Sequence, residues 1–199
     1  MRKSLVMMIF FIIGIISGYK TIIGKFVSGV DISIYALYIL LFLVGIGIGA
    51  DRRNWQVIRR ANIKIFLLPI SVIVGTLSIV GLLSFLIPNI NYLDSLAIGS
   101  GFGYYSISSV LITKLKSETL GVMALLSNIT REILTLLLTP FLVKYFGKLA
   151  PIASGGATSM DTTLPIITKF IGKEYALISV FNGIILTLIV PLLITLILR

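Results

Sequence analysis

The sequence contains no cysteine and no histidine among its 199 residues. Without cysteine, disulfides, thiolate catalysis and cysteine-ligated metals are excluded, and without histidine so are imidazole proton relays and histidine-bound metals. Charge is also scarce, since charged residues make up 12% of the chain and hydrophobic residues 57%, whereas a soluble domain carries about 25% charged residues. A water-soluble enzyme is therefore excluded, and we expect an integral membrane protein without enzymatic activity.

Basic residues outnumber acidic residues by 17 to 7, which gives a net charge of +10. They lie between apolar runs and form no basic face interleaved with aromatic residues, so we expect no nucleic-acid partner. Residues 51–64 are rich in arginine and lysine, and such loops stay on the cytoplasmic side of a bilayer. We therefore place this loop and the N-terminus inside the cell and the C-terminus outside.

Five apolar runs predict helices that cross the bilayer, each near the length of about 20 residues that a crossing needs. They are residues 5–19, 32–50, 63–87, 121–145 and 175–198. The first run lacks the small-residue cleavage site of a signal peptide, so we expect it to be retained. The chain is thus predicted to form a single all-α transmembrane domain that covers residues 1–199 and is surrounded by lipid.

Two further segments, residues 96–113 and 149–168, are rich in glycine and serine and align with each other without gaps. The alignment places Gly103 on Gly156 and Ser106 on Ser159. Backbone that leaves the helix at membrane depth needs cover from protein or a water-filled cavity, and secondary transporters use such breaks to hold their substrates.

The two segments either cross the membrane, which gives seven crossings, or re-enter it from opposite faces, which gives five. The count of basic residues on each side is the same for both arrangements. The central glycines favour a reversal, because glycine tolerates unusual dihedral angles. We therefore expect five full spans plus two interrupted or re-entrant segments.

Three charged residues, Arg131, Glu132 and Asp161, lie inside membrane segments. Each costs about 2.5–3.5 kcal/mol at the centre of a membrane helix unless it is paired, hydrated or part of a binding site. Asn128, Arg131 and Glu132 recur with two threonines at three- and four-residue spacing, which places them on one helix face. This polar stripe is either a structural seam or one wall of a transport site.

Asp161 follows the flexible pair Gly155 and Gly156 and stands among four hydroxyl side chains within residues 158–163. Carboxylate, hydroxyl and free carbonyl oxygens bind Na⁺ or accept hydrogen bonds from an ammonium group, although a helix N-cap uses the same residue types. Arg131, Glu132 and Asp161 carry a summed charge of −1, so we expect a cationic substrate. The candidate binding residues are Gly101, Gly103, Tyr104, Ser106, Asn128, Arg131, Glu132, Gly155, Gly156, Thr158, Ser159, Asp161 and Thr162.

These motifs, residues 101–106, 128–132 and 156–161, resemble in their order the LysO family of bacterial lysine exporters. The resemblance covers nearly the whole chain and implies a transporter domain that exports L-lysine and its toxic analogues across the cytoplasmic (inner) membrane, with Asp161 as the family's intramembrane acid. Longer members begin with a further part that carries additional spans and another functional acid. The resemblance therefore implies a homodimer, or a complex with a small membrane subunit that supplies this half.

The function predicted from the sequence is a secondary transporter that exports lysine, or another cationic amino acid, in exchange for H⁺ or Na⁺. The sequence does not decide between the two ions, and Na⁺ would bind near Asp161. No resident metal or cofactor is expected, and no nucleotide-binding motif is present. The alternatives are a non-transporting scaffold or regulatory subunit of a two-component transporter, and a passive channel.

Overall fold

The computed structural model describes residues 63–87 and 90–199, together with the single positions 35, 39, 42, 46 and 50. The chain divides into two compact units, Met1–Phe42 and Leu43–Arg199, and the description below concerns the second. The predicted span 5–19 lies outside the described residues. Only the five single positions of the predicted span 32–50 are described, and each of them is helical.

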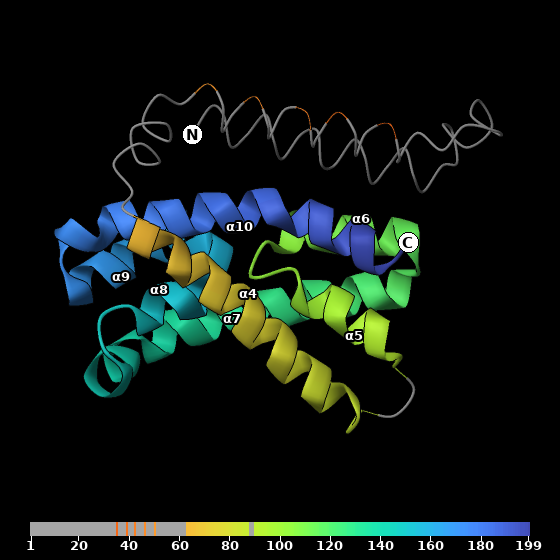
Figure 1. The fold of residues 1–199 in the computed structure, drawn as a ribbon, viewed down its shortest axis with the longest axis horizontal. Coiled ribbons are helices and arrows are strands. Elements are labelled where there is room, and N and C mark those ends of the chain that lie inside the picture. The colour runs from red at the N-terminus through yellow and green to blue at the C-terminus, as the bar shows by residue number, and fades with distance from the viewer. Residues whose placement is uncertain are drawn as a thin grey trace, which may run out of the picture. The chain divides into compact units, whose positions relative to one another are not determined.

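Every regular element in the described part of the chain is a helix (Figure 1). The elements are α4 (Ile63–Ser84), α5 (Tyr92–Gly99), α6 (Tyr105–Leu115), α7 (Glu118–Phe146), α8 (Ala150–Gly155), the 3-10 helix η1 (Gly156–Met160), α9 (Leu164–Ile171), the 3-10 helix η2 (Lys173–Tyr175) and α10 (Ala176–Ile197).

Three of these helical stretches, Ile65–Ser84, Glu118–Phe146 and Lys173–Ile197, are long and apolar enough to cross a membrane. They coincide with the sequence-predicted spans that begin at residues 63, 121 and 175. Ser117 caps the start of α7, where its hydroxyl accepts a hydrogen bond from Leu120 N. The prediction of an all-α membrane protein is confirmed for the described residues.

Both glycine- and serine-rich segments are interrupted at their glycines. In the first broken segment (residues 92–115), α5 ends at Gly99 and α6 begins at Tyr105. In the second (residues 150–171), α8 ends at Gly155, and η1 and a short turn precede α9. The four α-helices in these segments have 8, 11, 6 and 8 residues.

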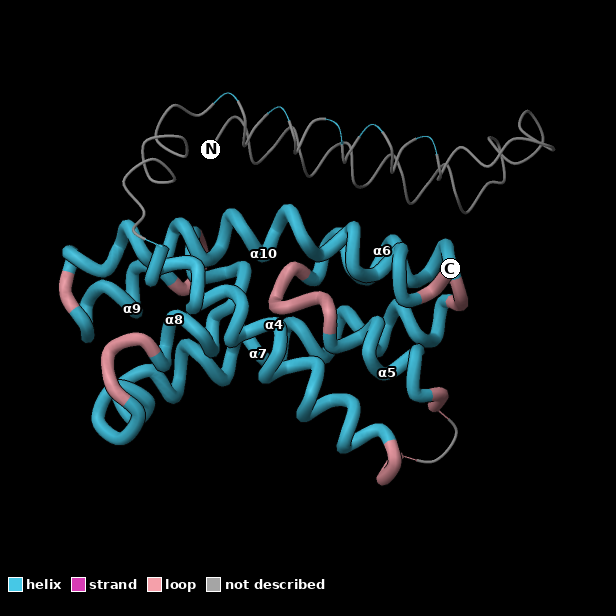
Figure 2. The backbone as a smooth tube through the Cα atoms, in the orientation of Figure 1, coloured by secondary structure: helices cyan, strands magenta, loops and turns pink. Residues whose placement is uncertain are grey.

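The chain reverses its direction within each broken segment. Asp94, at the start of α5, forms an ion pair with Lys116, just after α6. Lys148 precedes α8 and Tyr175 follows α9, and Lys148 Nζ lies 5.2 Å from the centroid of the Tyr175 ring. The two ends of each segment therefore lie near each other, and Figures 1 and 2 show the first segment toward the C-terminal end of α10 and the second toward the opposite end.

The turns of the two broken segments meet between α7 and α10. Ala157 N donates a hydrogen bond of 2.8 Å to the carbonyl oxygen of Phe102. Gly103 and Gly156 have φ angles of 97° and 61°, in the region that glycine adopts most readily. These are the two glycines that the sequence alignment superimposes, so the weak repeat in the sequence corresponds to a repeated backbone feature.

Gly156→Ala should destabilise the protein, because the new Cβ would overlap the carbonyl oxygen of Phe102 and the φ angle disfavours a side chain. A residue forced into such a conformation costs about 1–3 kcal/mol, and each kcal/mol lowers Tm by about 2–4 °C in a domain of this size. Thermal unfolding of the purified protein measures the loss.

Gly75→Ala is the matched control, because no atom lies within 4 Å of a Cβ at this helical position in α4. Its Tm should stay the same or rise slightly, since alanine favours helix more than glycine does. Equal Tm values for the two variants would contradict the contact between the turns.

Candidate functional site

Asn128 of α7 holds the turn of the first broken segment. Its Oδ1 accepts a hydrogen bond of 2.6 Å from Gly103 N. Its Nδ2 donates to Ala124 O at 2.8 Å and to Ser108 Oγ at 3.3 Å. A Cβ at Gly101 would overlap the Asn128 amide, so the turn approaches α7 as closely as only glycine allows. Asn128 thus satisfies a backbone donor that the helix break exposes.

Arg131 of α7 holds the second broken segment. Its Nε donates to Ser154 O at 2.8 Å, and its Nη2 donates to Ala153 O at 3.1 Å. Both carbonyls lie at the C-terminal end of α8, where the partial negative charge of a helix gathers. The guanidinium also reaches Thr76 Oγ1 on α4, at 3.4 Å. Arg131 is therefore stabilised by carbonyl and hydroxyl oxygens in this structure.

Asn182 of α10 binds the turn of the second segment and is completely buried. Its Nδ2 donates to Gly156 O at 3.0 Å and to Ser159 Oγ at 3.2 Å. Asn128 and Asn182 each bind a glycine that precedes them, by 25 and 26 residues respectively. Asn182 is not among the candidate residues named from the sequence, and this near-equal spacing is the signal that could have revealed its role.

A pocket of about 130 Å³ lies where the two broken segments meet. Both segments and α10 contribute to its wall. The lining residues are Gly103, Tyr104, Tyr105, Ser106, Ala157, Thr158, Met160, Asp161, Thr162 and Thr187.

Asp161 places its carboxylate at this pocket, directly after η1. Its Oδ1 accepts a hydrogen bond of 2.6 Å from Thr162 N, and the residue is exposed. No residue in the described part of the chain forms an ion pair with it. Asp161 is also the only carboxylate residue among those lining the pocket, so this pocket presents a negative charge to whatever enters it.

The structure divides the sequence-predicted site residues into two groups. The group that lines the pocket is Gly103, Tyr104, Ser106, Thr158, Asp161 and Thr162. The group outside the pocket lining is Gly101, Asn128, Arg131, Glu132, Gly155, Gly156 and Ser159.

The second group mostly shapes the turns. Gly101 and Gly156 allow close approaches, Ser159 Oγ bonds to Gly156 O and to Ser179 O on α10, and Gly155 O accepts a bond from Thr158 Oγ1. The side chain of Glu132 makes no hydrogen bond or ion pair with another described residue.

Four of the residues that line the pocket are absent from the candidate set named from the sequence, namely Tyr105, Ala157, Met160 and Thr187. Thr187 is one of the few polar residues on the largely apolar helix α10, a weak signal that could have been noticed. The others are adjacent in sequence to predicted residues. The described residues contain no group of three or more acidic side chains that could hold a metal ion.

Arg131→Gln should lower the stability of the protein, because it leaves the carbonyl oxygens of Ala153 and Ser154 without charged donors. A buried polar group that loses its partner costs about 1–3 kcal/mol. Glu132→Gln, at the neighbouring position, is the control and should change Tm much less. Thermal unfolding compares the two, and an equal loss for Glu132→Gln would contradict this specific role of Arg131.

Comparison with known proteins identifies the group of proteins to which this architecture belongs. The family described as "Lysine exporter LysO" matches residues 8–198. The chain is 34% identical to lysine exporter LysO of Escherichia coli (strain K12) over 167 residues, 82% of this chain and 54% of that protein. It is also 34% identical to a putative lysine exporter of Haemophilus influenzae over 164 residues, 81% of each chain.

The chain spans about half the length of the E. coli relative. No solved structure matches the chain significantly. The family match confirms the resemblance found in the sequence, and with it the assignment to transporters and not to enzymes. This chain belongs to the LysO family of lysine exporters.

Proposed function

We propose that this protein exports L-lysine across the cytoplasmic membrane as a secondary transporter, with Asp161 at the centre of its binding site. The observation that carries the proposal is the Asp161 carboxylate, which has no ion-pair partner among the described residues and lines a pocket where two broken helical segments meet. Broken helices hold substrate near the midplane in secondary transporters. The substrate comes from the relatives, which are named lysine exporters.

In this proposal Asp161 binds an ammonium group of lysine. An ion pair is stronger in a pocket within the membrane than in water, because the surroundings screen it less. Thr158 and Thr162 offer hydroxyl oxygens to the remaining ammonium protons, and the ring of Tyr104 adds a cation–π contact. Ser106 lies in the same wall and provides a further hydroxyl.

Asp161 also suits exchange with an inward-moving H⁺ or Na⁺. A lone carboxylate binds either the substrate ammonium, a proton, or Na⁺ together with the hydroxyl oxygens of Thr158 and Thr162. Competition for one carboxylate links the outward movement of lysine to the inward movement of the ion. The same pocket would admit lysine analogues that keep the ammonium group.

The membrane arrangement that we propose has five full spans and two re-entrant hairpins, one entering from each face. An α-helix rises about 1.5 Å per residue and the apolar core is about 30 Å thick. The longest arm, α6, has 11 residues, which is about half a crossing. The contacts between the two ends of each broken segment, Asp94 with Lys116 and Lys148 with Tyr175, support a reversal.

The repeated asparagine contacts support alternating access by two related halves. Each broken segment is bound by an asparagine on the long helix that follows it, Asn128 on α7 and Asn182 on α10. Inverted repeats of this kind let one half move against the other while the site stays between them.

We also propose that the chain works as a homodimer or with a small membrane subunit. Arg131 lines two open grooves of about 360 and 370 Å³, one shared with α4 and one along α7. No acidic residue among those described pairs with this guanidinium. A second membrane element that covers the grooves would shield the charge from lipid.

Asp161→Asn should reduce lysine counterflow in proteoliposomes by at least about tenfold, because the loss of a charged hydrogen-bond partner costs about 1.5–3 kcal/mol. The amide keeps the size and one hydrogen-bond acceptor of the carboxylate. Radiolabelled L-lysine in proteoliposomes that contain the chain, with any partner it requires, measures the effect.

The control is Glu174→Gln, an exposed acid in η2 that does not line the pocket. It should leave counterflow unchanged. Unchanged counterflow in Asp161→Asn would reject the site, and the absence of counterflow in the unaltered protein would favour the scaffold alternative.

The hairpin arrangement places Thr119 outside the cell and Lys148 inside. Both residues are exposed, and because the chain has no cysteine, a single introduced cysteine reports its own position. On intact cells, a membrane-impermeant maleimide should label a cysteine at 119 but not one at 148. Lys116 is the poorer probe position because it pairs with buried Asp94. Labelling at 148 but not at 119 would establish seven crossings instead.

A further inference from the structure

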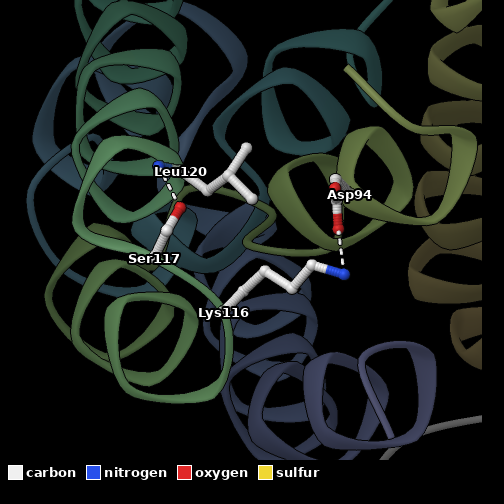
Figure 3. A network of polar contacts seen from close by, with 4 residues as sticks. All are labelled: Asp94, Lys116, Ser117 and Leu120. Carbon is white, nitrogen blue, oxygen red and sulfur yellow. Dashed lines mark hydrogen bonds and ion pairs between the residues drawn. The ribbon is translucent and has the colours of Figure 1, made fainter. Parts of the chain in front are cut away.

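A second carboxylate, Asp94, lies outside the pocket at the outer end of the first broken segment. It is in the first turn of α5, and its side chain is 8% exposed. Figure 3 shows the side chain of Lys116 extending from the end of α6 to this carboxylate. The Lys116 side chain is 45% exposed, and its Nζ lies 3.4 Å from Asp94 Oδ1. The pair therefore joins a buried acid to a base that remains in contact with solvent.

The contact between the two side chains is loose. Charge-assisted bonds between nitrogen and oxygen are usually about 2.7–2.9 Å long, shorter than the 3.4 Å here. Within the described residues, Asp94 Oδ1 receives no hydrogen bond, and the buried hydroxyl of the neighbouring Ser95 has no partner either. A buried carboxylate with so few donors can accept another ammonium group in place of Lys116.

Lys116 presents a primary ammonium on a four-carbon stem, and free lysine presents the same group. We propose that Asp94 is a second ammonium-binding site, which Lys116 occupies as a tethered substitute and which a free cationic amino acid takes by displacing it. The identity of the ligand rests on the proposed function, whereas the site itself rests on the geometry of Asp94 and Lys116.

The position of Asp94 suits a step in substrate release. Asp94 precedes Gly99 at the turn by five positions in α5, a distance of about 7.5 Å along the helix. A lysine that leaves Asp161 through this end of the protein therefore meets a second carboxylate, which reduces the cost of giving up the first.

Lys116 is attached to the chain next to Asp94, and this attachment explains why such a site would not retain the substrate. A group attached by a short flexible linker competes at an effective concentration of millimolar order. Free lysine must displace Lys116 to bind at Asp94, and Lys116 can displace it in return. The site thus binds the leaving substrate weakly and briefly, as an exit requires.

The test is chemical rescue of Lys116→Met, measured by thermal unfolding of the full-length purified protein with any partner it requires. Every variant also carries Asp161→Asn, so that binding in the pocket does not contribute. Lys116→Met leaves Asp94 unpaired and should lower Tm. Millimolar L-lysine or n-butylammonium should restore it, with a half-effective concentration about tenfold lower than in the protein that retains Lys116.

Two controls separate this site from general salt effects. Adding Asp94→Asn to Lys116→Met should abolish the rescue, because the neutral amide no longer attracts a cation. Lys148→Met, just before the second broken segment, should show no rescue at all. Sodium chloride at the same ionic strength should restore less than n-butylammonium does, since Na⁺ lacks the ammonium's hydrogen-bond donors.

Lys116→Gln replaces Lys116→Met if the latter does not fold, because its amide still donates a hydrogen bond to Asp94. Rescue no greater than that by sodium chloride, or rescue that survives Asp94→Asn, would overturn the proposal and leave the pair as a structural tie. Rescue is measured without transport, so its failure leaves the proposed export function standing, and a failure of lysine counterflow leaves this site standing.

Discussion

The constraint on which the structure depends is that a helix broken at membrane depth must have its backbone polar groups satisfied by protein. An unpaired peptide group in an apolar medium costs several kcal/mol. Here Asn128 pairs with Gly103 N, Arg131 with the carbonyls at the end of α8, and Asn182 with Gly156 O. The bond from Ala157 N to Phe102 O then joins the two turns. The long helices α7 and α10 thus supply the side chains that hydrogen-bond to the backbone at both breaks.

The chemistry of the pocket follows from this arrangement. Asn128 and Arg131 bind backbone groups and do not line the pocket. Asp161 is the charged residue that does line it. An acid held by fixed neighbours and facing an open space is available for a cationic ligand. At the outer end of the first broken segment a second acid, Asp94, is buried instead, and Lys116 supplies its cation from the chain itself.

Much of this organisation could be predicted from the sequence. The low charge and long apolar runs predicted a helical membrane protein, and the central glycines predicted where two segments are interrupted. The gapless alignment placed Gly103 on Gly156, and both glycines adopt positive φ angles. Asp161 and Thr158 were predicted as pocket residues from their chemistry alone. Periodicity also placed Asn128 and Arg131 on one face of α7, but it carries no information about what that face contacts.

The sequence by itself thus determined the helices, their breaks and the charges within them, because hydropathy, glycine content and residue spacing are local properties. Only the tertiary structure decided which polar residues support the turns and which face the pocket. Arg131 could have bound a substrate carboxylate, and Asp94 could have been an ordinary interfacial charge, until the partners of each were known. Those partners lie up to 55 residues away in the chain, at Thr76 for Arg131, and only folding brings them within hydrogen-bonding distance.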